Sequence, residues 1–221
     1  ENPGIDNRVR KHVGGELMTI DDYRNRYAQY RSDPALRAVH AAFPFLVVWD
    51  DHEVDNNYAG LYQEAGAPVE QFALRRAAGY RAYYEHMPLR RSCIPRGALL
   101  QLYRPFTYGN LASIFMLDTR QYRTDQPCGD NVQLLCEDAR DPKATMLGAA
   151  QEKWLMDGLH RSRTGWNLLG QQIPVARLDR MPGPERRFIS GRSAARKQEP
   201  GSPKTVKGRF RYRRLRSVND H

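Results

Sequence analysis

The sequence predicts an α/β fold, in which a sheet is layered with helices, followed by a basic tail. An apolar run at residues 45–49 contains two β-branched residues and ends abruptly in Asp50-Asp51-His52-Glu53. Apolar runs without alternation are typical of strands covered on both faces. Two segments with helical spacing precede this run, and helix-then-strand order favours a parallel sheet with helical crossovers. From residue 180 onward apolar residues thin out and arginine recurs without a regular period, which predicts disorder.

The first two predicted helices precede the apolar run. Apolar and aromatic residues recur at helical spacing from residue 20 to about residue 31, so we predict a helix there. Thr19, with Asp22 three residues later, resembles a capping pair at its start. Asp33 followed by Pro34 is typical of a helix N-terminus, and this second helix is expected to end before Pro44.

The middle of the chain predicts a long helix and then a hairpin. Residues 66–68 form a Gly-Ala-Pro turn signal, and residues 69 to about 86 have helical character. Strands are predicted at residues 99–104, 106–109 and 112–117, with Tyr108-Gly109-Asn110 as a hairpin turn. A helix from residue 148 to about 161 and a strand at residues 166–169 follow, and residues 173–178 are a candidate for another strand.

The acidic motif after the apolar run has the side chains of a metal site. Ligands in α/β folds gather beyond the carboxyl ends of strands, where this motif is expected to lie. A hard cation such as calcium, magnesium, manganese or ferric iron would suit oxygen donors. The alternative is that these acids solvate a loop and cap the next element. The candidate ligands are Asp50, Asp51, His52, Glu53, Asp55, Asn56 and Asn57.

A second strand, at residues 112–117, also ends in polar residues, Asp118 and Arg120. If the two strands are parallel neighbours, these side chains lie on the same rim as Asp51 and His52. The planar fork of Arg120 suits a phosphate group. The alternative is an ion-pair network of Asp118 and Arg120 that holds the long polar loop at residues 122–144, which we expect to cover or line the site.

A family resemblance rests on these motifs. Trp49-Asp50-Asp51-His52-Glu53-Val54, followed by Asn56-Asn57, resembles the signature of PhoD-type alkaline phosphatases, a branch of the calcineurin-like metallophosphoesterases. Residues 117–123 with 125–130, and residues 147–155 leading to Gly170-Gln171-Gln172, agree with it in the same order. Gln171 and Gln172 either reach the site or close a turn.

The resemblance implies metal-assisted hydrolysis of phosphate esters with ferric iron and calcium, at alkaline pH and in a periplasmic or secreted protein. Cations would polarise the phosphoryl oxygens and generate hydroxide from bound water. It implies Asp51 as a metal ligand and Asp50 as a direct or supporting one. His52 would contact the phosphoryl group or a metal, and Arg120 would act with His52 in catalysis.

The resemblance also implies two segments. Residues 1–179 form a partial PhoD-like domain with a partial metallophosphoesterase-like sheet, and residues 180–221 form the tail. A preceding strand with Gly-Asp-x-x-Tyr and a following Gly-Asp-x-His segment are expected in the family but not found in this sequence. We therefore hypothesise an internal fragment with a non-homologous end, such as a shifted reading frame would give, and predict little or no hydrolysis of p-nitrophenyl phosphate. The alternatives are a non-catalytic remnant and a basic module that binds polyanions through the tail.

The distribution of charge along the chain limits the classes of binding partner that we expect. The net charge of +10 belongs to residues 180–221, which hold 13 Lys and Arg against 3 acids, whereas residues 1–179 hold 22 of each. We therefore expect a phosphate ester substrate and no specific nucleic-acid partner. No apolar run is long enough to span a membrane, and no signal sequence is visible. The three cysteines lack zinc-site spacing; Cys128 and Cys136 either form a disulfide, if the protein is exported, or stay free thiols.

Overall fold

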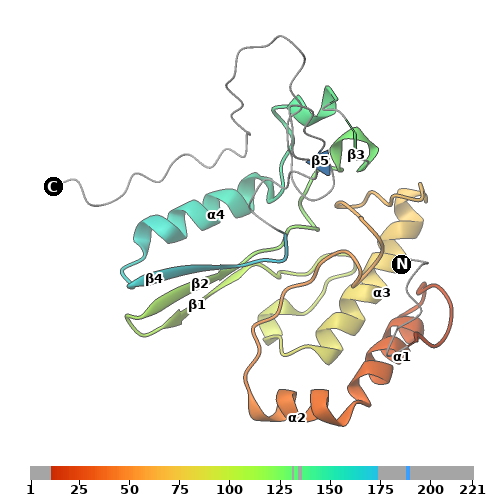
Figure 1. Cartoon of the computed structure of the whole chain (residues 1–221), viewed down its shortest axis with the longest axis horizontal. Helices are drawn as coiled ribbons and strands as arrows, with labels where there is room; N and C mark the ends of the chain where they lie inside the picture. Colours follow the sequence, from red (N-terminus) through yellow and green to blue (C-terminus); the bar gives the residue numbers. More distant parts are fainter. Residues whose placement is uncertain (1–10, 131, 134–135, 174–187, 190–221) are drawn as a thin grey trace.

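The computed structural model describes residues 11–130, 132–133, 136–173 and 188–189. Within these ranges it is an α/β structure, as predicted, with a three-stranded mixed sheet and helices beside it. Figure 1 shows α4 along one face of the sheet and α1, α2 and α3 gathered beside it. The candidate strand at residues 173–178 and the boundary between residues 179 and 180 lie outside the described residues. So does the predicted tail apart from Phe188–Ile189.

The three N-terminal helices form as predicted. Helix α1 (Ile20–Arg31) begins at a capping box, in which the Thr19 hydroxyl accepts from the Asp22 N–H and the Asp22 carboxylate accepts from the Thr19 N–H at 2.7 Å. Helix α2 (Pro34–Ala42) begins at Asp33, whose carboxylate accepts from the Leu36 N–H at 3.0 Å. Helix α3 (Val69–His86) packs against α1.

The sheet has the strand order β1–β2–β4. Strands β1 (Arg104–Tyr108) and β2 (Ala112–Met116) form the predicted antiparallel hairpin, which turns at Gly109 with φ of +53°. Helix α4 (Gly148–Arg161) connects β2 to the parallel strand β4 (Trp166–Gly170). Phe115 and Leu117 pack against Leu155 between the sheet and α4, so this unit has its own small core.

A second, aromatic core lies between α3 and the acidic motif. The Trp49 ring is fully buried and stacks on Tyr80 with 4.1 Å between the ring centroids. Tyr58, Phe72 and Tyr83 belong to the same cluster. The segment just before the acidic residues is therefore fixed by packing against a helix.

The predicted buried strand at residues 45–49 is wrong. These residues are assigned to no strand, and Leu46 is 43% exposed. The apolar run is used differently, because Trp49 packs on α3 and the Val47 carbonyl accepts from Arg104 Nη2 at 2.9 Å. The condition that this segment and β2 are parallel neighbours is therefore not met, since β2 pairs with β1 and β4. The strand predicted at residues 99–104 is largely wrong as well, since β1 begins only at Arg104.

Short elements follow β2 and lie near one another in Figure 1. They are η2 (Pro127–Asp130), β3 (Val132–Gln133) and η3 (Asp138–Arg140). A further short helix, η1 (Arg91–Cys93), lies between α3 and β1. Strand β5 (Phe188–Ile189) pairs antiparallel with β3. Cys128 and Cys136 form a disulfide, which decides between the two alternatives for these cysteines. None of the described helices has the length and apolar character of a membrane span.

Candidate functional site

Three predicted site residues meet although their segments are not paired strands. Arg120 Nε donates to Asp50 Oδ1 at 2.7 Å, and Arg120 Nη2 lies 3.5 Å from Asp51 Oδ1. Arg120 and Asp51 are 4% and 6% exposed, whereas Asp50 reaches the surface. The two polar motifs therefore form one buried ion-pair cluster with an accessible edge.

The loop at residues 50–60 wraps around Asp51. The Asp51 carbonyl accepts the N–H groups of Val54 and Asp55, each at 2.8 Å, which closes a turn. Asp51 Oδ2 accepts the Asn57 N–H at 2.8 Å, and Asn57 takes a φ of +50° to reach it. The conformation of the loop is thus set around one carboxylate.

The Asp51 carboxylate is held in its anionic form. Burial alone would raise the pKa of Asp51, but the Arg120 charge and the Asn57 N–H outweigh burial and hold this pKa below its usual range. A carboxylate in this state keeps its negative charge through neutral and alkaline pH.

Other candidate oxygen ligands have structural contacts. Glu53 accepts the Asp50 N–H at 2.7 Å, and burial raises the pKa of Glu53 although this hydrogen bond opposes it. Asp55 pairs with the buried Arg75 at 3.1 Å. Asn56 donates to Glu64 at 2.5 Å on the surface. These contacts shape the loop, and none of them involves Arg120.

His52 lies at the outer edge of the cluster. Its side chain is 73% exposed, and Nε2 lies 3.7 Å from Asp51 Oδ2. The imidazole is therefore accessible from solvent while it stays next to a buried anion.

Asp118 is the most buried acid of this region. Its Oδ1 accepts the Trp49 indole N–H at 3.0 Å and the backbone N–H groups of Arg120 and Gln121 at 3.0 and 2.9 Å. Burial raises the pKa of Asp118, and these donors oppose the increase. The expected ion pair of Asp118 with the Arg120 side chain is replaced by pairing of that guanidinium with Asp50 and Asp51.

Glutamine side chains surround the cluster, and only weak sequence signals mark them. Gln126, in the predicted covering loop, donates to the Asn57 carbonyl at 2.6 Å, so this loop borders the site. Gln172 donates to the Thr119 hydroxyl, whereas Gln171 accepts the Ile173 N–H at 3.1 Å and closes a turn. Gln121 and Gln151 lie in the motif stretches and hold Asp118, a role that the sequence does not predict because no periodicity marks these residues.

The described residues do not by themselves fit a complete metal centre. They contain no group of three or more His, Cys, Asp or Glu side chains placed to hold a cation. Asp50 and Asp51 offer two carboxylates, and both already face Arg120. Calcium takes six to eight oxygen ligands, so a full site would need more donors than this part of the chain supplies.

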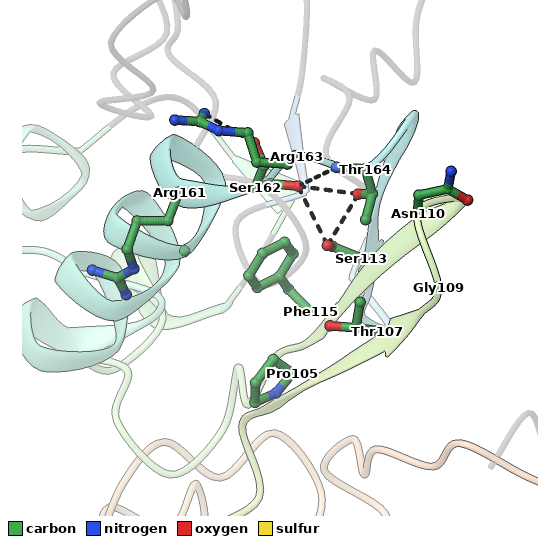
Figure 2. A pocket seen from close by; sticks show the side chains of 11 residues that line it. Pro105, Thr107, Gly109, Asn110, Ser113, Phe115, Arg161, Ser162, Arg163 and Thr164 are labelled. Carbon is green, nitrogen blue, oxygen red and sulfur yellow. Dashed lines mark hydrogen bonds between the residues drawn. The ribbon is translucent and has the colours of Figure 1, made fainter.

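A separate cavity of about 460 Å³ lies between the end of α4 and the β1–β2 hairpin. Figure 2 shows the hydroxyl groups of Ser113, Ser162 and Thr164 turned toward one another at its edge. These hydroxyls are 3.0 to 3.3 Å apart and satisfy one another. Asp50, Asp51, His52 and Arg120 do not line this cavity.

Comparisons with known proteins agree with the motifs. Residues 3–214 match the family model described as "PhoD-like phosphatase". This match continues beyond residue 180, where the resemblance of the motifs ends. "Alkaline phosphatase D" of Bacillus subtilis (strain 168) is 57% identical over 169 residues, which cover 76% of this chain and 29% of that protein.

A solved structure is also similar. The structure titled "Structure of PhoD" superposes with a TM-score of 0.79 at 53% identity and covers 82% of this chain and 35% of that one. The chain thus spans about a third of the length of these relatives.

Proposed function

Because the chain belongs to the PhoD-like phosphatase family, we propose that Asp50, Asp51, His52 and Arg120 form part of a site that hydrolyses phosphate esters at alkaline pH. The observation that carries this proposal is the contact of Arg120 with Asp50 and Asp51, two motifs that are 70 residues apart. The polyanion-binding alternative is not favoured, because the family match includes most of the basic tail.

Arg120 is suited to bind a phosphoryl group. Asp50 and Asp51 hold Nε and Nη2, which fixes the plane of the guanidinium. The buried Nη1 has no hydrogen-bond partner among the described residues. An unpaired buried donor is costly, and a phosphoryl oxygen would satisfy it. A guanidinium fixed before the substrate arrives stabilises charge that develops on phosphoryl oxygens without reorganising.

Ferric iron and calcium remain part of the proposal through the family resemblance. Asp51, anionic at alkaline pH, and Asp50 would supply two oxygen donors, and further donors would have to come from outside the described residues. When bound, such cations polarise phosphoryl oxygens and lower the pKa of water. His52 would contact the phosphoryl group from the solvent side, which its exposure and its position beside Asp51 support.

A periplasmic or secreted location is also proposed. The Cys128–Cys136 disulfide supports it, because disulfides persist in oxidising compartments and are rare in the cytosol.

A chimera tests the proposed function. The aligned segment of B. subtilis alkaline phosphatase D would be replaced by the corresponding residues of this chain, and hydrolysis of p-nitrophenyl phosphate measured at alkaline pH with iron and calcium. We expect activity that Asp51→Asn abolishes, whereas Asp157→Asn, at an exposed surface pair on α4, leaves it unchanged. A folded chimera without activity would refute the proposal. The chain alone, assayed in parallel with metal analysis by mass spectrometry, is expected to turn over little or no substrate.

A further inference from the structure

The acidic loop at residues 50–60 is attached at both ends to one turn, residues 118–121. At its start, the Trp49 indole donates to Asp118 Oδ1 at 3.0 Å. At its end, the Gly60 N–H donates to the Arg120 carbonyl at 2.9 Å. Between these attachments, the Arg120 side chain contacts Asp50 and Asp51. The position of the two carboxylates therefore depends on the shape of this turn.

Asp118 sets the shape of the turn. Its Oδ1 accepts the N–H groups of both Arg120 and Gln121, which curls the backbone around the carboxylate. The turn is also fixed to α4, because the Asp118 N–H donates to Gln151 Oε1 at 2.9 Å and Gln151 Nε2 donates to the Asp118 carbonyl at 2.8 Å. Asp118 and Gln151 are 0% and 1% exposed, so water does not compete for these bonds.

Only a carboxylate satisfies all four donors around Asp118. Gln121 Oε1 accepts the Leu100 N–H at 3.1 Å and Gln121 Nε2 donates to the Leu100 carbonyl at 2.8 Å, which fixes the orientation of the amide. The same Nε2 then donates to Asp118 Oδ2 at 3.0 Å. An asparagine at residue 118 would place an NH₂ group against this NH₂ group or lose the bonds to Oδ1. The two carboxyl oxygens of Asp118 thus accept from four donors, and no basic side chain in the described part of the chain forms an ion pair with Asp118.

We propose that Asp118 is a positioning residue, which through Trp49 and the 118–121 turn holds Asp50, Asp51 and Arg120 in the arrangement that the reaction uses. This inference rests on the proposed function, since it names a residue that acts through others at that site.

The full chain labelled with ¹⁵N allows a test that needs neither metal nor substrate. The Arg120 Nε–H, bonded to Asp50, and the amides of Asn57 and Gly60 report on the arrangement of the loop. In Asp118→Asn we expect these three to exchange with solvent at least about tenfold faster, whereas the amides of α1 change less than about twofold. Asp157→Asn is the matched control and should change none of them. A change of equal size in α1, or no change at the three reporters, would overturn the proposal.

A milder variant covers the case in which Asp118→Asn does not fold. Trp49→Phe keeps an aromatic ring that can stack on Tyr80, and it removes the indole donor together with part of the ring volume. It should speed exchange of the Arg120 Nε–H and the Asn57 amide in the same direction, and Trp166→Phe, at a residue 65% exposed, should not. Unchanged exchange in Trp49→Phe would contradict the role of Asp118.

Steady-state kinetics test whether the position of the acidic loop affects the reaction. In an active chimera, the substitution corresponding to Asp118→Asn should lower kcat at least about tenfold and change KM less than about threefold, because only the transition-state arrangement is lost. An unchanged kcat would overturn the proposal. If the chimera is inactive with Asp118 present, the proposed function fails, and the exchange experiment still decides whether Asp118 positions the loop.

Discussion

Arg120 Nε lies 2.7 Å from Asp50 Oδ1 although 70 residues separate the two in the sequence. The guanidinium is 5% exposed and also lies 3.5 Å from the buried carboxylate of Asp51. Removing the cation would leave Asp51 as a buried anion without its ionic partner, and buried pairs broken in this way are costly.

Arg120→Ala is therefore expected to lower the free energy of unfolding by about 3 kcal/mol. Urea denaturation measures this change. Arg140→Ala is a suitable control, because Arg140 pairs with Glu137 at 3.2 Å on the surface and its loss should cost less than about 0.5 kcal/mol. Equal losses in the two variants would contradict the importance of the buried pair.

Arg120→Lys tests the geometry of the charge. Lysine keeps the positive charge but lacks the planar fork, so it cannot hold two carboxylates and a phosphoryl oxygen together. In an active chimera we expect kcat to fall about 10²- to 10³-fold. Steady-state kinetics with p-nitrophenyl phosphate would measure it, with Arg163→Lys as the control outside the site. A kcat within twofold of the unsubstituted chimera would exclude Arg120 from the reaction.

Glu85 gives a pH dependence of stability. Its hydrogen bond with Arg24, helped by Arg81, lowers the pKa of Glu85 to about 2. The pKa of Glu85 is lower in the folded state than in the unfolded state. The ion pair therefore contributes stability at pH values above the model-peptide pKa of about 4.3, and this contribution is lost as the pH falls toward 2. Arg24 lies on α1 and Glu85 on α3, so the pair joins two helices.

Glu85→Gln should reduce stability by about 1 kcal/mol at pH 7, a value discounted for solvent screening, and by less at pH 3. Thermal unfolding between pH 3 and 7 measures the difference. Glu70→Gln, at an exposed residue in the first turn of α3, is the control. A stability difference between the parent chain and Glu85→Gln that grows toward low pH would reverse the predicted sign.

The Cys128–Cys136 disulfide closes a short loop that follows Gln126. Removing the disulfide increases the conformational entropy of the unfolded chain. It also loosens the loop that contains Gln126, which contacts Asn57. We expect the double variant Cys128→Ser and Cys136→Ser to lose about 2 kcal/mol of stability. Dithiothreitol should have a similar effect on the parent chain and none on the double variant, in which the buried Cys93 remains. If the reductant destabilises both proteins equally, its effect does not come from this disulfide.

Local signals in the sequence predicted the helices well. Thr19 and Asp33 each cap a helix with neighbouring residues, so a short window holds the information for α1 and α2. The strand expected at residues 45–49 is wrong because an apolar run shows neither which element it packs against nor how much of it is buried, and only Trp49 of this run is buried. Here the partner of Trp49 is the ring of Tyr80 on a helix, and no local pattern predicts that contact.

The structure brings three of the predicted site residues together, but not through the contacts that the sequence predicted. Strand-end acids and an arginine drew attention to Asp50, Asp51 and Arg120, and the structure brings them together. Residues 45–49 form no strand beside β2, and a turn around Asp118 brings these side chains together instead. Gln121 and Gln151 act only through tertiary contacts, and a glutamine in a sequence does not predict such contacts.

The double attachment of the acidic loop has a consequence for how the protein folds. Helices α1 and α2 are capped by neighbouring residues. The bond of Trp49 to Asp118, in contrast, closes a span of 69 residues, and the turn around Asp118 also needs Gln151 from α4. Long-range closures are entropically slow. We therefore expect the two carboxylates to take their final positions late in folding, after the chain through α4 is available.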